Sequence, residues 1–227
     1  MKATAIIPAH NEGLRIGRVL KQVTTHPLIA HTIVVDDGSS DQTVEEARKY
    51  AVSIISIPYT GKGGALARGV SEAGSPILFF CDADIVNLTH EDITRVVRPV
   101  LESAAGMCIG ARASKTRRCG PLSWNPLLDG QRAVHRQVWD AVPNFLKRGY
   151  MIEVALNTIA RRSGIPVHIE YLALSQCTKE EKYGFARGRL SRLGMLAQVF
   201  VSHLLSRCIP LKRVSESERR FLGRVES

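Results

Sequence analysis

Short apolar runs alternate with longer amphipathic stretches in the first half of the chain, and this alternation limits the fold more than any other feature. We predict strands at 4–8, 32–36, 52–57, 76–81 and 106–110, and helices at 12–25, 41–50, 64–73 and 90–103. Thr89 and Asp92 have the spacing of a capping box at the start of the last helix. Strands and helices in alternation pack as right-handed βαβ units. The sequence therefore predicts an α/β fold with a mostly parallel sheet flanked by helices.

The alternation stops after Ala111. The stretch from Ser114 to Trp124 is polar, basic and interrupted by Gly and Pro, which predicts a loop. This loop could cover an active site, contact an acceptor or simply lie on the surface. With 227 residues, 44% of them hydrophobic, the chain can bury one substantial core. We therefore expect one domain, or two halves that share one sheet.

Two carboxylates flank one small residue in Asp82-Ala83-Asp84, directly after the apolar run Ile77–Cys81. Acidic residues at the carboxyl end of a buried strand lie where open α/β sheets bind ligands. Oxygen ligands so spaced can hold Mg²⁺, which is usually bound by one or two carboxylates together with phosphate oxygens. The same tripeptide also occurs in turns and helix caps, so it is the position directly after a predicted buried strand that indicates a ligand site.

Three further polar segments follow or open predicted elements. The segment Ala5–Glu12 ends a strand in a Pro-containing turn, and its Asn11 also suits a helix N-cap. Asp36 and Asp37 end the next strand, where one of them can form a simple turn. The segment Tyr59–Ala65 is glycine-rich and contains a lysine, a combination suited to phosphate, although its spacing matches neither the Walker A motif nor G-x-G-x-x-G.

In order and spacing, these four segments resemble the donor-binding half of glycosyltransferase family 2, which has the GT-A (Rossmann-like) fold and uses nucleotide-diphosphate sugars. The shared motifs read P-A-H-N-E, V-D-D-G-S-S-D, G-K-G-G-A and D-A-D. The third is also similar to that of dolichyl-phosphate glucosyltransferases and, more loosely, of glucosyl-3-phosphoglycerate synthases. The resemblance implies a GT-A domain over 1–180, with a nucleotide-sugar half at 1–111, an acceptor half at 112–180, and a basic helical extension at 181–227.

The resemblance also implies roles for individual residues. The nucleotide-sugar site comprises Pro8, Ala9, Glu12, Asp36, Asp37, Lys62, Asp82 and Ala83. Within it, Lys62 lies near the nucleotide and Asp82 near the ribose. Asp84 is expected to hold the Mg²⁺ or Mn²⁺ ion on the diphosphate, and so to serve catalysis.

Two residues of the second half are further candidates. Glu153 follows a Gly-Tyr turn at the head of a predicted helix, where the helix dipole alone would favour a carboxylate. Relatives carry an acidic residue here, and an inverting transfer needs a base near the incoming hydroxyl. His168 lies in the strand-like run Pro166–Glu170 and is a candidate third metal ligand, although a lone histidine on a strand is more often packed or solvated.

The formal net charge is +10, and residues 181–227 hold ten Lys and Arg against four acids. Such an excess attracts phosphates on a sugar nucleotide, an anionic lipid or a nucleic acid. Nucleic acid is the poorer candidate, because aromatics form only 6% of the chain and do not interleave with the basic runs. The five cysteines are scattered, which suits a reducing cytoplasm and argues against disulfides or a zinc site. Neither a signal peptide nor a membrane-spanning segment is predicted.

The segment from Leu190 to Leu205 predicts an amphipathic helix. Leu190, Leu193, Leu196, Ala197, Phe200 and Leu204 share one face, and Ser191, Gln198 and Ser202 lie opposite. Such a stripe usually closes a core. Because arginines flank it, however, we expect peripheral association with an anionic membrane, on the inner face of the cell membrane, near a lipid-linked acceptor.

The sequence therefore predicts a metal-dependent hexosyltransferase, with glucose from UDP-glucose as the expected donor and a hydroxyl or phosphate, free or lipid-linked, as the acceptor. Retaining transfer to a small phosphorylated acceptor such as 3-phosphoglycerate is the first alternative. A nucleotidyltransferase would show G-x-G-T-x-x-R at its first strand, where this chain has P-A-H-N-E. A non-catalytic membrane-surface or nucleic-acid binding protein would not need D-A-D. The sequence does not predict the oligomeric state.

Overall fold

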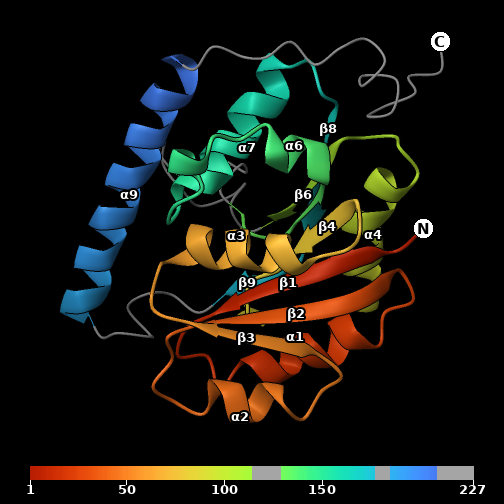
Figure 1. The fold of residues 1–227 in the computed structure, drawn as a ribbon, viewed down its shortest axis with the longest axis vertical. Coiled ribbons are helices and arrows are strands. Elements are labelled where there is room, and N and C mark those ends of the chain that lie inside the picture. The colour runs from red at the N-terminus through yellow and green to blue at the C-terminus, as the bar shows by residue number, and fades with distance from the viewer. Residues whose placement is uncertain (114–128, 177–184, 209–227) are drawn as a thin grey trace.

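A computed structural model describes residues 1–113, 129–176 and 185–208, and a seven-stranded sheet with helices on both faces runs through it (Figure 1). The strand order is β3-β2-β1-β4-β7-β6-β8. The strands are β1 (Ala3–Ala9), β2 (Ile29–Asp37), β3 (Ser53–Ile57), β4 (Ile77–Phe80), β6 (Met107–Arg112), β7 (Arg132–His135) and β8 (Val167–Leu172). The short strands β5 (Ile85–Val86) and β9 (Ser175–Gln176) pair separately. The expected loop at 114–124 lies outside the described residues.

The helices alternate with the strands as the sequence predicts. They are α1 (Ile16–Thr24), α2 (Thr43–Ala47), α3 (Lys62–Glu72), α4 (His90–Leu101), α6 (Arg136–Asp140), the 3₁₀ helix η2 (Asn144–Leu146), α7 (Met151–Arg162) and α9 (Phe185–Cys208). The described pairings of the seven-stranded sheet are parallel except those of β7, which runs antiparallel between β4 and β6. The prediction of a mostly parallel sheet flanked by helices is thus confirmed, and β7 is an addition to it.

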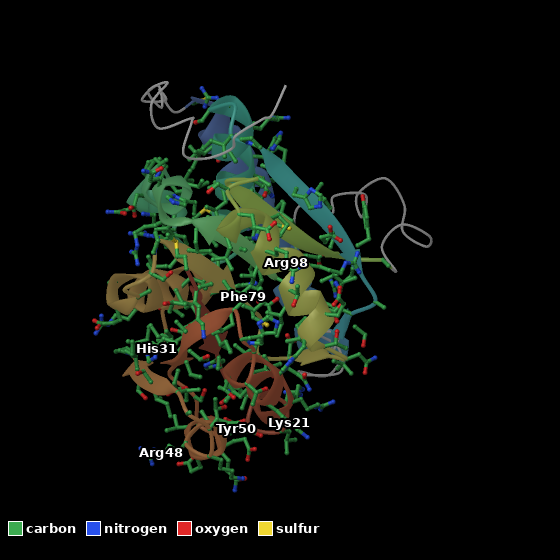
Figure 2. The ribbon with its side chains drawn as sticks, turned by 90° about the vertical axis from the view of Figure 1, so that its right-hand side faces the viewer. Lys21, His31, Arg48, Tyr50, Phe79 and Arg98 are labelled. Atoms are coloured by element: carbon green, nitrogen blue, oxygen red, sulfur yellow. The ribbon has the colours of Figure 1, made fainter. Side chains whose placement is uncertain are left out.

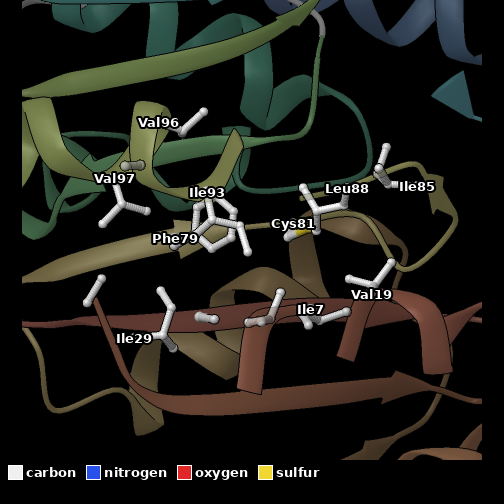
Figure 3. Packing of buried hydrophobic residues seen from close by; sticks show 14 of the residues in the cluster. Ile7, Val19, Ile29, Phe79, Cys81, Ile85, Leu88, Ile93, Val96 and Val97 are labelled. Carbon is white, nitrogen blue, oxygen red and sulfur yellow. The ribbon is translucent and has the colours of Figure 1, made fainter. Parts of the chain in front are cut away.

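The strand-forming runs are apolar because the central strands are covered on both faces. Side chains alternate between the two faces of a strand, so Ile6 and Ile7, like Phe79 and Phe80, enter different core clusters. The cluster containing Ile7 and Phe79 packs under α1 and α4 (Figure 3). The cluster containing Ile6 and Phe80 packs under α3, α6 and α7. Charged residues such as Lys21 and Arg48 lie on the outside, whereas Phe79 is enclosed (Figure 2).

Two helix starts differ in how well the sequence predicts them. The capping box at Thr89 and Asp92 is present, with both reciprocal bonds formed. Helix α1 begins at Ile16, later than expected, because Asn11 adopts a positive φ of 56° and does not cap it. The Asn11 side chain instead accepts a hydrogen bond from the Ser40 backbone N–H, at 2.8 Å. Asn11 therefore ties the loop after β1 to the loop after β2.

Helix α9 stands beside α7 (Figure 1). Ser202 and Ser206 are fully buried, and the Ser202 hydroxyl donates to the Met151 carbonyl at 2.8 Å. Phe200 and Leu204 are exposed, at 65% and 49%. Core closure, the usual explanation of such a stripe, does not apply to its two large side chains that the structure describes, because the opposite, polar side makes the contacts with α7. Within the described residues, no helix has the length and apolar character to cross a bilayer.

Candidate functional site

Most of the predicted site residues gather at one edge of the sheet. Because β1, β2 and β4 are parallel, their carboxyl ends meet there. Strand β1 ends at Pro8 and Ala9, and the loop after it contains Glu12. Strand β2 ends at Asp36 and Asp37, and β4 is followed by Asp82, Ala83 and Asp84. Two residues come from helices, Lys62 from the first turn of α3 and Glu153 from the first turn of α7. This is the position at which doubly wound sheets bind their ligands.

The Lys62 ammonium lies at the centre of the site. Its Nζ lies 2.6 Å from Asp82 Oδ1 and 2.7 Å from Glu153 Oε1, so one cation joins residues from three separate elements. Burial acts to lower the pKa of Lys62, but the charges of Asp82 and Glu153 outweigh it and raise this pKa above its usual value. Lys62 therefore stays charged throughout the working pH range, and it offsets two carboxylates that would otherwise repel each other.

Glu153 is held from two sides. Its carboxylate, with a side chain only 6% exposed, faces Lys62. Its backbone carbonyl accepts a hydrogen bond from the Arg132 guanidinium, at 3.4 Å. The start of α7 is set by Gly149, which has a φ of 47°, and by the Tyr150 N–H, which donates to Gln198 Oε1 on α9 at 3.0 Å. The carboxylate predicted as a base is thus buried, paired and rigidly placed.

Arg132 is a second buried cation, and the sequence predicts no such role for it. It is 1% exposed, and it donates to the Asp129 carbonyl at 2.6 Å and to Asn157 Oδ1 at 3.2 Å. Burial lowers the pKa of Arg132, and the carboxylates of Glu153, Asp129 and Asp82 oppose that shift. A guanidinium nevertheless stays charged in proteins. One feature of the sequence could have indicated that Arg132 is buried, because it directly precedes the short apolar run Ala133–Val134.

The two aspartates of D-A-D have different surroundings. Asp82 pairs with Lys62 through Oδ1, and its Oδ2 accepts a hydrogen bond from Gln131 Nε2 at 3.2 Å. Asp84 is 4% exposed, and Ala83 between them is buried. Burial, and then the charges of Asp82 and Asp84, raise the pKa of the Cys81 thiol well above its usual value. Cys81 is consequently an unreactive core residue, and the carboxylates are the chemically useful groups here.

The glycine-rich segment is held in place by Asp37. Its Oδ1 accepts hydrogen bonds from the Thr60 N–H and hydroxyl, at 2.7 and 2.9 Å, and its Oδ2 accepts one from the Gly61 N–H at 2.8 Å. Gly61 has a φ of 79°, which glycine adopts readily. A Cβ at Gly63 would lie 2.7 Å from the Arg148 backbone, so this glycine allows α3 and the start of α7 to approach each other. Asp37 and the glycines therefore place Lys62.

The remaining predicted nucleotide contacts lie beside this group. Asp36 is 5% exposed and accepts a hydrogen bond from the Ser39 N–H at 3.1 Å. Glu12 is 7% exposed and forms an ion pair with Arg15 at 2.8 Å. These positions are compatible with a nucleoside pocket, and the contacts with a nucleotide remain predictions.

His168 lies apart from D-A-D. It is the second residue of β8, near the end of the strand opposite to the edge that carries the site. Its Nε2 lies 2.7 Å from Glu170 Oε1, and Arg95 on α4 binds the same carboxylate. In the part of the chain that the structure describes, no three His, Cys, Asp or Glu residues are placed to hold a metal ion together. The structure thus does not bring His168 to Asp84 as a third ligand.

Comparison with known proteins assigns this geometry to a family. Residues 4–163 match the family described as Glycosyl transferase family 2. Two solved structures of glucosyl-3-phosphoglycerate synthase from Mycobacterium tuberculosis share the fold, each with a TM-score of 0.74 over 93% of this chain. One, with Mn²⁺, UDP and glucosyl-3-phosphoglycerate, is 24% identical, and the match covers 81% of its chain. The other, with Mn²⁺, UDP-glucose and glycerol 3-phosphate, is 25% identical, and the match covers 82% of its chain.

A curated relative matches a shorter region. The 4,4'-diaponeurosporenoate glycosyltransferase of Staphylococcus aureus is 32% identical over an alignment of 100 residues, and the match covers 41% of this chain. The match spans 27% of that relative's length. It therefore compares one region of the two proteins, and the relative's substrate is not transferred to this chain by it.

The burial of Lys62 between two carboxylates leads to a stability prediction. Lys62→Met should lower the free energy of unfolding at neutral pH by about 3 kcal/mol, because two buried carboxylates lose their counter-charge. The loss should shrink as the pH falls, since protonating one carboxyl group removes the repulsion. Equilibrium urea unfolding measures both effects. Lys49→Met, which removes an exposed ion pair with Glu46, is the matched control and should change little.

Proposed function

The chain belongs to glycosyl transferase family 2, and on this premise we propose that it transfers glucose from UDP-glucose to a hydroxyl or phosphate group of an acceptor. The observation that carries the proposal is the meeting of Lys62, Asp82 and Glu153 at the carboxyl edge of the sheet. The cation suits a diphosphate donor, and a carboxylate beside it suits an acceptor that must lose a proton. The neighbouring structures that contain UDP-glucose support the choice of donor.

The donor is proposed to lie across the ends of β1, β2 and β4. Its nucleoside would contact Pro8, Ala9, Glu12, Ala83 and one of Asp36 and Asp37. Its ribose would lie near Asp82, and its diphosphate near Lys62. The Lys62 ammonium is already buried and charged, so it can offset negative charge on the departing diphosphate without reorganising.

A divalent cation fits the carboxylates present. Asp84 and Asp82 offer the oxygen ligands that Mg²⁺ and Mn²⁺ prefer, and such ions complete their shell with phosphate oxygens and water. We propose that Asp84 is the principal protein ligand. When bound, the ion would supply positive charge to the leaving diphosphate. The solved neighbours contain Mn²⁺ or Mg²⁺ together with UDP, which supports this choice of ion.

Glu153 is proposed as the base in an inverting transfer. The acceptor oxygen would form a bond to the anomeric carbon, its proton would pass to a Glu153 carboxylate oxygen, and the bond from the anomeric carbon to the diphosphate would break. A second candidate is retaining transfer to a small phosphorylated acceptor. The solved neighbour with glycerol 3-phosphate and UDP-glucose, at 25% identity, favours a phosphorylated acceptor specifically.

We also propose that the enzyme associates with anionic membranes through α9. Phe200, Val201, Leu204 and Leu205 are all at least 42% exposed and lie on the side of α9 away from α7. The sequence places Arg189, Arg192 and Arg207 on the same helix. Apolar side chains flanked by cations suit the interface of an anionic bilayer. This association would bring the site to a lipid-linked acceptor.

The donor and metal proposal is tested by Asp84→Asn. This substitution should keep the fold and remove the Mn²⁺-dependent part of UDP binding, because a neutral amide is a poor ligand for a hard cation. Isothermal titration calorimetry with Mn²⁺ and with EDTA measures the difference. Asp140→Asn, on the exposed end of α6, is the control. Unchanged Mn²⁺-dependent binding in Asp84→Asn would show that Asp84 does not hold the metal.

The chemical role of Glu153 is tested by Glu153→Gln. The amide keeps the shape and can still accept from Lys62, so UDP-glucose affinity should persist while transfer falls by at least ~100-fold. Transfer is measured by release of UDP with the acceptor that gives turnover. Glu72→Gln, at the exposed end of α3, is the control. Near-normal transfer by Glu153→Gln would exclude Glu153 as the base and favour an acceptor that is already ionised.

Membrane association is tested by flotation with vesicles that contain phosphatidylglycerol. The protein should float at low salt and less as the salt concentration rises, because screening weakens the attraction. Phe200→Asp should reduce flotation. Phe145→Asp is the matched control, since Phe145 is also exposed, at 50%, but lies on η2. Absence of flotation at low salt, or equal loss in both variants, would contradict the proposal.

A further inference from the structure

A cavity of about 490 Å³ lies between α7, β8 and α9, away from the donor site. Its ten described lining residues include Val154, Arg161, Ile165, Val167, Ile169 and His203. The volume is in the range of small-molecule sites, which are mostly apolar with a few polar groups. No motif in the sequence predicts this cavity, and the proposed glucosyl transfer does not use it.

The lining divides into an apolar part and a basic part. Val154 and Ile165 are buried, and Val167 and Ile169 are half-buried, so they form the walls. Arg161 lines the cavity and is exposed to solvent, so its guanidinium is available to an anionic group at the opening. His203 adds a second basic side chain from α9. None of the ten described lining residues is acidic, so the cavity suits a ligand with an apolar body and an anionic end.

The opening adjoins the exposed apolar side of α9. His203 lines the cavity, whereas the adjacent Leu204 and the residue one turn earlier, Phe200, are exposed. The cavity therefore lies next to the surface that we propose to meet the bilayer. An alkyl chain that entered from that surface would leave its anionic end near the basic side chains of Arg161 and His203.

The Arg161 end of the cavity is remote from the transfer site, although Val154 at the other end adjoins Glu153. Arg161 follows Glu153 by eight residues on α7, a rise of about 12 Å along the helix. An anionic group at Arg161 is therefore too far from Glu153 to be the acceptor group. The ligand of this cavity is accordingly a second ligand.

We propose that this cavity binds one alkyl chain of an anionic amphiphile, with the chain against Val154, Ile165 and Ile169 and the anionic group at Arg161 and His203. The proposal does not depend on the identity of the sugar donor. It adds a lipid-binding site to α7, the helix that also carries Glu153.

The test is calorimetric binding of monomeric dodecyl phosphate to the full chain, with inorganic phosphate and dodecyl maltoside as comparison ligands. Dodecyl phosphate should bind at least ~10-fold more tightly than either, because only it supplies both the chain and the charge. Comparable binding of inorganic phosphate would reveal an anion site without a chain site. Comparable binding of dodecyl maltoside would remove the role of Arg161 and His203. Either result, or no binding of dodecyl phosphate, would overturn the proposal.

Two pairs of variants locate the bound ligand. Ile169→Trp fills the cavity from β8, at one edge of the sheet, and should reduce affinity at least ~10-fold; Ile55→Trp, on the opposite edge strand β3, should not. Arg161→Gln should reduce dodecyl phosphate affinity at least ~10-fold, whereas Arg98→Gln on the exposed side of α4 should not. If Ile169→Trp does not fold, Val167→Trp replaces it. Unchanged affinity in the filled variant would place the ligand elsewhere and overturn the assignment.

UDP titration in the presence of Mn²⁺ separates this proposal from the proposed function. Donor binding without dodecyl phosphate binding would contradict the cavity site alone. Dodecyl phosphate binding without donor binding would contradict the proposed glucosyl transfer alone.

Discussion

The site depends on one buried ammonium group that lies between two carboxylates. Lys62 approaches Asp82 and Glu153 within 2.7 Å, and these three residues come from α3, from the loop after β4 and from α7. Without the cation, the two acidic groups would repel each other in a poorly solvated space. Several other features serve to place Lys62. Asp37 holds the turn before it, and Gly63 allows the start of α7 to come close.

Arg132 is a second buried cation beside this group. Arg132 reaches the backbone carbonyl of Glu153 because β7 inserts antiparallel between β4 and β6. The pairing places Arg132 opposite Phe80, the last residue of β4. Removing either member of a buried ion pair is costly, but the pair itself contributes little net stability compared with an apolar substitute. The charged cluster is therefore better explained by the ligand that it suits than by the stability of the fold.

The elements that the sequence predicts are those encoded locally. Strands β1, β2 and β4 each contain a continuous apolar run, and the capping box of α4 needs only Thr89 and Asp92. The family resemblance led to Lys62, Asp82 and Glu153, but not to their mutual ion pairs, which require the closure of loops between distant residues. Strand β7 was not predicted because it has only four residues and begins with a charged one. The distance of His168 from Asp84 could not be predicted, because residue type alone does not indicate at which end of β8 a side chain lies.

The orientation of α9 could not be predicted from its stripe of apolar residues, because a stripe does not specify which side faces the protein. The polar side faces inward since it has backbone partners there: the Ser202 hydroxyl donates to the Met151 carbonyl, and Gln198 accepts from the Tyr150 N–H. Both partners precede Glu153 by no more than three residues. The outward-facing helix is thus hydrogen-bonded to the turn that places the proposed base. A displacement of α9 must either break these bonds or move that turn, so the exposed apolar surface and the transfer site are mechanically joined through the start of α7.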